Sequence, residues 1–97
     1  MAFAHPIVLL SNASATGDPI VWPGGIGVVD VCGTFSGATV TLKMLGSDGS
    51  TYQTVGAYTT FTAAGAGGFG PLPQGATLKM FVTGGPPSGL YATAGRV

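Results

Sequence analysis

The distribution of glycine and proline is the feature that most restricts what this chain can fold into. Its 97 residues include 18 glycines and 7 prolines, placed so that only short segments lack both. In a helix interior a glycine costs about 1 kcal/mol and a proline about 3 kcal/mol relative to alanine. Threonine and valine, which favour strands, are abundant, and glutamate is absent. The sequence therefore predicts an all-β fold whose short strands are separated by turns.

Alternation of apolar and polar residues locates the strands. In the segment Thr39–Leu45, Val40 and Leu42 fall on one face and Lys43 on the other, which is typical of a half-buried strand. Asp48 is followed by glycine, and this dipeptide between alternating segments predicts a hairpin turn. Glycine and proline clusters predict loops at residues 65–68 and 84–89. We expect strands at residues 7–10, 26–35, 39–45, 51–55, 59–63, 77–82 and 90–97.

About seven short antiparallel strands of this kind predict a single small β-sandwich or barrel-like domain. Residues 26–97 carry most of the alternation, so we expect them to form this domain. Residues 1–25 are rich in turn residues, and two interpretations are open for this N-terminal segment. It forms either an extended arm that lies on a neighbouring subunit, or a loop draped over its own domain.

One internal similarity links two of the expected strands. The segment GATVTLKM at residues 37–44 resembles GATLKM at residues 75–80, so that Lys43 and Lys79 occupy equivalent places. A duplicated half-motif would explain the similarity. Convergence of β-turns and alternating strands on similar sequences explains it equally simply, and we favour that interpretation because the copies differ in length.

The low content of charged residues restricts the function. Charged side chains make up 6% of the chain, and three cations balance three anions. A monomer without net charge lacks the repulsion that keeps proteins apart, and a surface of hydroxyls and small residues is buried without an ion-desolvation penalty. This favours burial in an assembly over a neutral monomer. Three cations are too few to neutralise many phosphates or to hold an anionic membrane, so neither nucleic acid nor a membrane is expected as a partner.

Few residues are available for catalysis or for metal binding. His5 is the only histidine, and Asp18, Asp30 and Asp48 are the only acidic side chains. General acid–base catalysis needs a positioned pair of groups, and zinc needs more ligands than His5 and Cys32 provide. We therefore predict a non-enzymatic protein with no catalytic residue, no metal site and no cofactor.

Two residues of the expected strand 26–35 need their own interpretation. Asp30 interrupts an apolar run, and it either faces solvent or pairs with Arg96 or a lysine. Cys32 is the single cysteine, so no disulfide within the chain is possible. Its apolar surroundings predict a buried, inert thiol.

Aromatic and large apolar residues are the remaining candidates for a binding surface. They either fill the core or an interface, or stack on a sugar around Trp22 or Tyr58. The candidate interface residues are Phe3, Ile7, Trp22, Tyr58 and Tyr91.

Three strings carry a resemblance to a known class of proteins. GTFSGATVTL at residues 33–42, SDGSTY at residues 47–52 and TGGPPSGLYA at residues 83–92 resemble small β-sandwich virion structural proteins of tailed bacteriophages. The resemblance covers about the last two-thirds of the chain. Because these strings are strands and turns, no binding residue is carried over from them.

The resemblance implies a capsid decoration or cement protein, made in the host cytoplasm and placed on the virion. Its expected partners are the major capsid protein and further copies of itself, with a trimer favoured. Two alternatives remain open. One is a head-fibre or tail-tip module that recognises a host-surface glycan, and the other is a structural component of the tail or neck.

Overall fold

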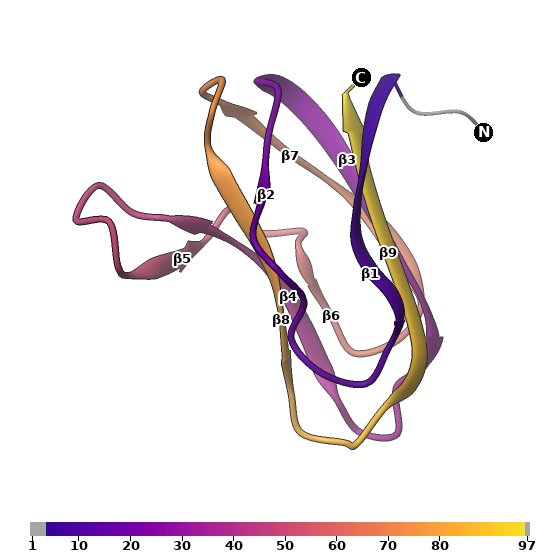
Figure 1. The fold of residues 1–97 in the computed structure, drawn as a ribbon. Helices are drawn as coiled ribbons and strands as arrows, with labels where there is room; N and C mark the ends of the chain where they lie inside the picture. The colour runs from indigo at the N-terminus through magenta and orange to yellow at the C-terminus, as the bar shows by residue number, and fades with distance from the viewer. Residues whose placement is uncertain (1–3, 97) are drawn as a thin grey trace.

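The computed structural model describes residues 4–96, which form nine strands in two antiparallel sheets packed face to face (Figure 1). Sheet A consists, in order, of β1 (Ala4–Ala13), β9 (Ser88–Arg96), β3 (Gly25–Thr34) and β7 (Gly65–Leu72). Sheet B consists of β2 (Ile20–Val21), β8 (Thr77–Thr83), β4 (Thr39–Leu45) and β5 (Tyr52–Thr54), with β6 (Thr60–Phe61) also paired to β4. The protein is therefore a small all-β sandwich, as predicted.

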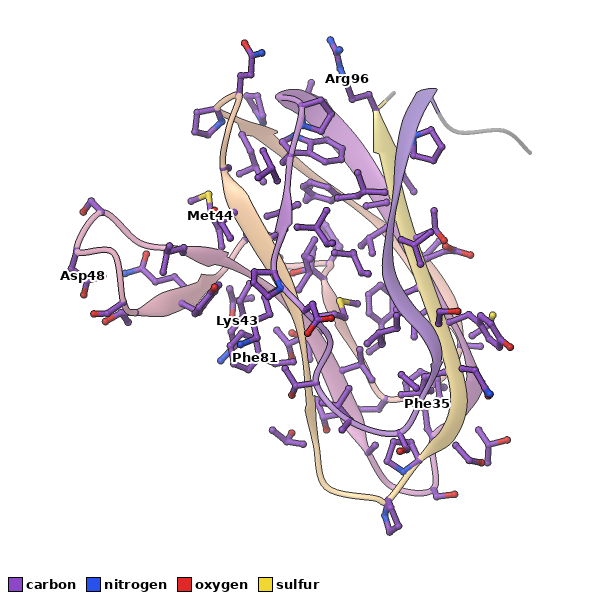
Figure 2. The ribbon with its side chains drawn as sticks, in the orientation of Figure 1. Phe35, Lys43, Met44, Asp48, Phe81 and Arg96 are labelled. Atoms are coloured by element: carbon purple, nitrogen blue, oxygen red, sulfur yellow. The ribbon has the colours of Figure 1, made fainter. Side chains whose placement is uncertain are left out.

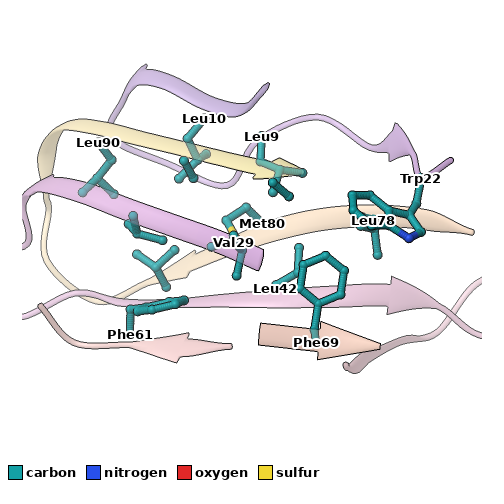
Figure 3. Close-up of a cluster of buried hydrophobic side chains, with 14 of the residues drawn as sticks. Leu9, Leu10, Trp22, Val29, Leu42, Phe61, Phe69, Leu78, Met80 and Leu90 are labelled. Atoms are coloured by element: carbon teal, nitrogen blue, oxygen red, sulfur yellow. The ribbon is translucent and has the colours of Figure 1, made fainter. Parts of the chain in front are cut away.

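The core lies between the inner faces of the two sheets (Figure 3). Strict alternation along β3 turns Val29 and Val31 inward, where they meet Leu42 of β4 and Met80 of β8. Each of these side chains is almost completely removed from water, and burial of a side chain of this size contributes about 1.5–3 kcal/mol. The alternation that predicted the strands is thus also the pattern that builds the core.

Trp22 closes one end of this core. Its side chain is 0% exposed, and its indole Nε1 donates a hydrogen bond to the carbonyl oxygen of Gly25 over 3.2 Å. The indole therefore combines a large apolar contact area with a satisfied polar group, the arrangement that makes a buried tryptophan favourable.

The N-terminal segment lies on its own domain. β1 pairs with β9 as the outer strand of sheet A, and Leu9 and Leu10 reach the core. Further along, Gly17 N donates to the carbonyl oxygen of Met80 over 3.1 Å, and β2 continues this contact with the edge of β8. Residues 4–25 thus supply a strand to each sheet of their own domain.

All seven predicted strands overlap strands of the structure, but two observed strands were not predicted. β2 is only two residues long. β7 includes residues 65–68, for which the prediction of a loop was wrong. Its glycines pair with β3, Gly67 opposite Val29 and Gly65 opposite Val31. A side chain at Gly67 would collide with the backbone carbonyl of Tyr58, so the strand needs glycine there. Because glycines occupy most of residues 65–68, the segment lacks the alternation of apolar and polar side chains that predicts a strand.

Candidate interface

The predicted interface residues do not form one surface. Trp22 is buried in the core, and Ile7 is partly buried and packs against the core from β1. Tyr58 is 73% exposed in the turn between β5 and β6, whereas Tyr91 is exposed on β9 of the other sheet. Phe3 lies outside the described residues, as does the side chain of His5. Of the four described candidates, Tyr58 and Tyr91 are the exposed ones, and they lie apart, Tyr58 in a turn beside sheet B and Tyr91 on β9 of sheet A.

Tyr91 belongs to a mostly apolar sheet face that the sequence did not reveal as a unit. Residues directly opposite each other in neighbouring antiparallel strands project to the same face. Cys32 lies opposite Tyr91, Thr93 lies opposite both Asp30 and Val8, and Val28 lies between two glycines of β7 and β9. We call this surface the outer face of sheet A, and it comprises Val8, Ile26, Val28, Asp30, Cys32, Tyr91 and Thr93.

The outer face of sheet A is apolar and almost free of charge. Val8 is 58% exposed, Ile26 55% and Tyr91 49%, although all three are large apolar or aromatic side chains. Within the described residues of this face, Asp30 carries the single charge, and Ala66 opposite it is small. Burial of this face against another molecule would remove these apolar side chains from water and desolvate one carboxylate.

The exposed position of Cys32 contradicts the prediction of a buried thiol. Val29 and Val31 point into the core, so the next residue of β3 necessarily points outward. The apolar composition of the run suggested burial on both faces. In the part of the chain that the structure describes, however, no element covers the outer face of sheet A, so the thiol meets solvent.

Asp30 and Arg96 are placed apart by the register of β3 and β9. Asp30 lies opposite Thr93, whereas Arg96 lies opposite Gly27, three residues before Asp30 in β3. Three residues of a strand span about 10 Å, and an odd spacing places the two side chains on opposite faces. The register therefore fits the interpretation in which the Asp30 side chain faces solvent, and it does not fit an ion pair between Asp30 and Arg96.

Asp48 has a structural role at the tip of the β4–β5 hairpin, which projects from one side of the sandwich (Figure 2). Its Oδ1 accepts hydrogen bonds from the backbone N–H groups of Ser50 and Thr51 over 3.0 and 2.9 Å, and its Oδ2 accepts one from the Thr51 hydroxyl over 2.6 Å. These donors, the Thr51 hydroxyl foremost, lower the pKa of Asp48 from 3.8 to about 2. The predicted turn is confirmed.

A hollow of about 330 Å³ lies between β1 and the segment that leads into β2. Among its lining residues are Leu9, Ser11, Thr16 and Asp18. Within residues 4–96, no three histidine, cysteine or acidic residues are grouped so that they could hold a metal ion. No helix suited to crossing a membrane occurs among the described residues either. The outer face of sheet A, on which Val8, Ile26 and Tyr91 are exposed, is a candidate binding surface.

Comparison of the chain with known protein families, with curated proteins and with solved structures gives no match.

Proposed function

We propose that this protein is a non-enzymatic structural subunit of a bacteriophage virion. In this proposal it decorates the capsid: it binds the outer surface of the shell between major capsid subunits and stabilises it. The observation that carries the proposal is the outer face of sheet A, which exposes Val8, Ile26 and Tyr91 around the single charge of Asp30. The resemblance of residues 33–42, 47–52 and 83–92 to virion structural proteins supports the same conclusion.

The physical properties of this face suit repeated weak attachment. Each Å² of apolar surface removed from water contributes about 25 cal/mol, and a nearly uncharged face loses little of that gain to ion desolvation. Binding of one subunit remains modest because association also costs translational and side-chain freedom. Many subunits on one symmetric shell, and subunits joined to each other as trimers, would hold it by avidity.

The test is binding of the purified protein to capsids stripped of their accessory proteins. We expect saturable binding with a fixed number of copies per capsid, and a higher temperature of capsid disruption. The variant Ile26→Asp places a charge on the outer face of sheet A and should abolish binding. Val21→Asp is the matched control, because Val21 is 63% exposed on the opposite sheet and should tolerate the same change.

Loss of binding by both variants, or no saturable binding by the unchanged protein, would exclude this mode of attachment. Light scattering of the free protein tests self-association in the same preparation.

A glycan-binding module of a head fibre or tail tip is the second candidate function. Exposure of Tyr58 favours it, since an open aromatic ring can stack on a sugar. Binding of a host-surface glycan that is lost in Tyr58→Ala, while Tyr91→Ala still binds, would favour this function over capsid decoration.

A further inference from the structure

The outer face of sheet B carries a cluster of two lysines and two aromatic rings, which we call the lysine–aromatic cluster: Lys43, Tyr52, Lys79 and Phe81. Lys43 Nζ lies 4.8 Å from the centroid of the Phe81 ring, and Lys79 Nζ lies 5.3 Å from the same centroid. Lys79 Nζ is also 5.3 Å from the centroid of Tyr52, whose ring meets Phe81 edge to face. Figure 2 shows Lys43 and Phe81 side by side on the outside of the sheet.

The two lysines are direct neighbours across the sheet. The similar segments 37–44 and 75–80 contribute β4 and β8, and Lys43 lies opposite Lys79 in their register. Like charges directly opposite each other destabilise a sheet. The chain nevertheless places two of its three cations in this arrangement, where cation–π contacts of about 0.5–1 kcal/mol each offset part of the repulsion.

The described acidic groups of the chain are poorly placed to neutralise this pair. Asp30 lies on the opposite sheet, and the oxygens of Asp48 are occupied by the hairpin turn. Asp18 lies in the segment that runs beside β8, between Gly17, which bonds to Met80, and Ile20, which pairs with Leu78. It also lines the hollow beside β1, and it offers one carboxylate for two ammonium groups.

We propose that the lysine–aromatic cluster binds an acidic, extended segment of a partner protein. Both ammonium groups are held beside one ring, so less side-chain freedom is lost on binding than for two free lysines. Alternate side chains of an extended segment lie on one face about 7 Å apart, so two of its carboxylates can reach both lysines. The adjacent β5 is the edge strand of sheet B and offers backbone groups to such a segment.

The position of the ammonium groups argues for a polypeptide over an acidic sugar. A sugar that stacks on an aromatic residue needs an open ring face, and both rings of the cluster are partly buried and carry lysine Nζ atoms close to them. Carboxylates approaching the ammonium groups need no open ring. This surface lies on the sheet opposite to the proposed capsid-binding face, so the two inferences are independent.

The probe is a synthetic peptide of alternating glutamate and serine, titrated into isotope-labelled protein while backbone amide resonances are followed by NMR. We expect shifts centred on β4, β5 and β8, and weaker binding as salt rises from about 10 mM to about 150 mM. The double variant Lys43→Met/Lys79→Met keeps apolar stems over the rings and removes both charges. It should bind the peptide about fivefold more weakly, the effect expected from two exposed ion pairs.

Two controls make the test decisive. Arg96→Met removes one positive charge outside the cluster and should leave the affinity unchanged, whereas Lys43→Met alone makes the same change in net charge and should weaken binding. Lys43→Arg/Lys79→Arg keeps both charges and should retain binding. Equal affinity of the double variant and the unchanged protein would overturn the proposal, and so would preferential binding of sialyllactose or of a heparin fragment at the same residues.

Discussion

The indole ring of Trp22 packs against the ring of Phe69, with centroids 5.0 Å apart and ring planes tilted by 56°. The two residues come from opposite sheets, since Trp22 follows β2 and Phe69 belongs to β7. Gly27 of β3 lies beneath both rings, and a Cβ atom there would approach each of them to 2.6 Å. This contact between the sheets therefore depends on the absence of a side chain at Gly27.

The first prediction follows from that dependence. Gly27→Ala should lower the free energy of unfolding by about 1–3 kcal/mol, because both rings must move to accommodate the methyl group. Urea denaturation followed by tryptophan fluorescence measures the change. Gly56→Ala is the control, since a Cβ atom there meets nothing within 4 Å. A Gly27→Ala variant as stable as the Gly56→Ala variant would show that the Trp22–Phe69 contact is loosely packed.

The second prediction concerns the acid titration of the β4–β5 hairpin. Thr51→Val removes the hydroxyl that contributes most to lowering the pKa of Asp48, so this pKa should rise from about 2 toward 3.8. Because the folded-state pKa lies below the unfolded value, the turn stabilises the protein above pH 3.8 and loses this contribution as the pH falls toward 2. NMR titration of the Asp48 side chain gives the pKa directly.

Thr51→Ser is the control for this measurement, because serine keeps the hydroxyl and should keep the low pKa. An unchanged pKa in Thr51→Val would assign the effect to the backbone N–H groups of Ser50 and Thr51 alone.

Strands with side chains on both faces could be predicted from the sequence, and strands without them could not. Alternation gave the bounds of β4, and the Asp48 turn gave its hairpin. In β7 most positions are glycine or alanine, so the inward direction of Phe69 leaves no repeating pattern. β2 is fixed by backbone contacts with β8 and by burial of the neighbouring Trp22, which are tertiary effects.

The candidate surfaces show the same division. The sequence identified Tyr91 as an interface candidate. The residues that surround Tyr91 on the outer face of sheet A come from β1 and β3, and only the register of these strands with β9 shows that they share a face. The lysine–aromatic cluster had a visible signal, the equivalent positions of Lys43 and Lys79 in two similar segments. That the two strands are neighbours, and that Phe81 lies beside both lysines, required the structure.

The last prediction uses the exposed thiol of Cys32 as a reporter of the outer face of sheet A. A maleimide reagent should label Cys32 in the folded protein without denaturant, because the side chain is exposed opposite Tyr91. If this face is the proposed capsid contact, bound capsids should protect Cys32 from labelling, and protein labelled beforehand with a bulky maleimide should no longer bind. Mass spectrometry measures the extent of labelling, and co-sedimentation with capsids measures the binding of the labelled protein.

Labelling that requires denaturant would contradict the exposed position of the thiol. Equal labelling of free and capsid-bound protein would instead place the capsid contact on another surface, such as the outer face of sheet B.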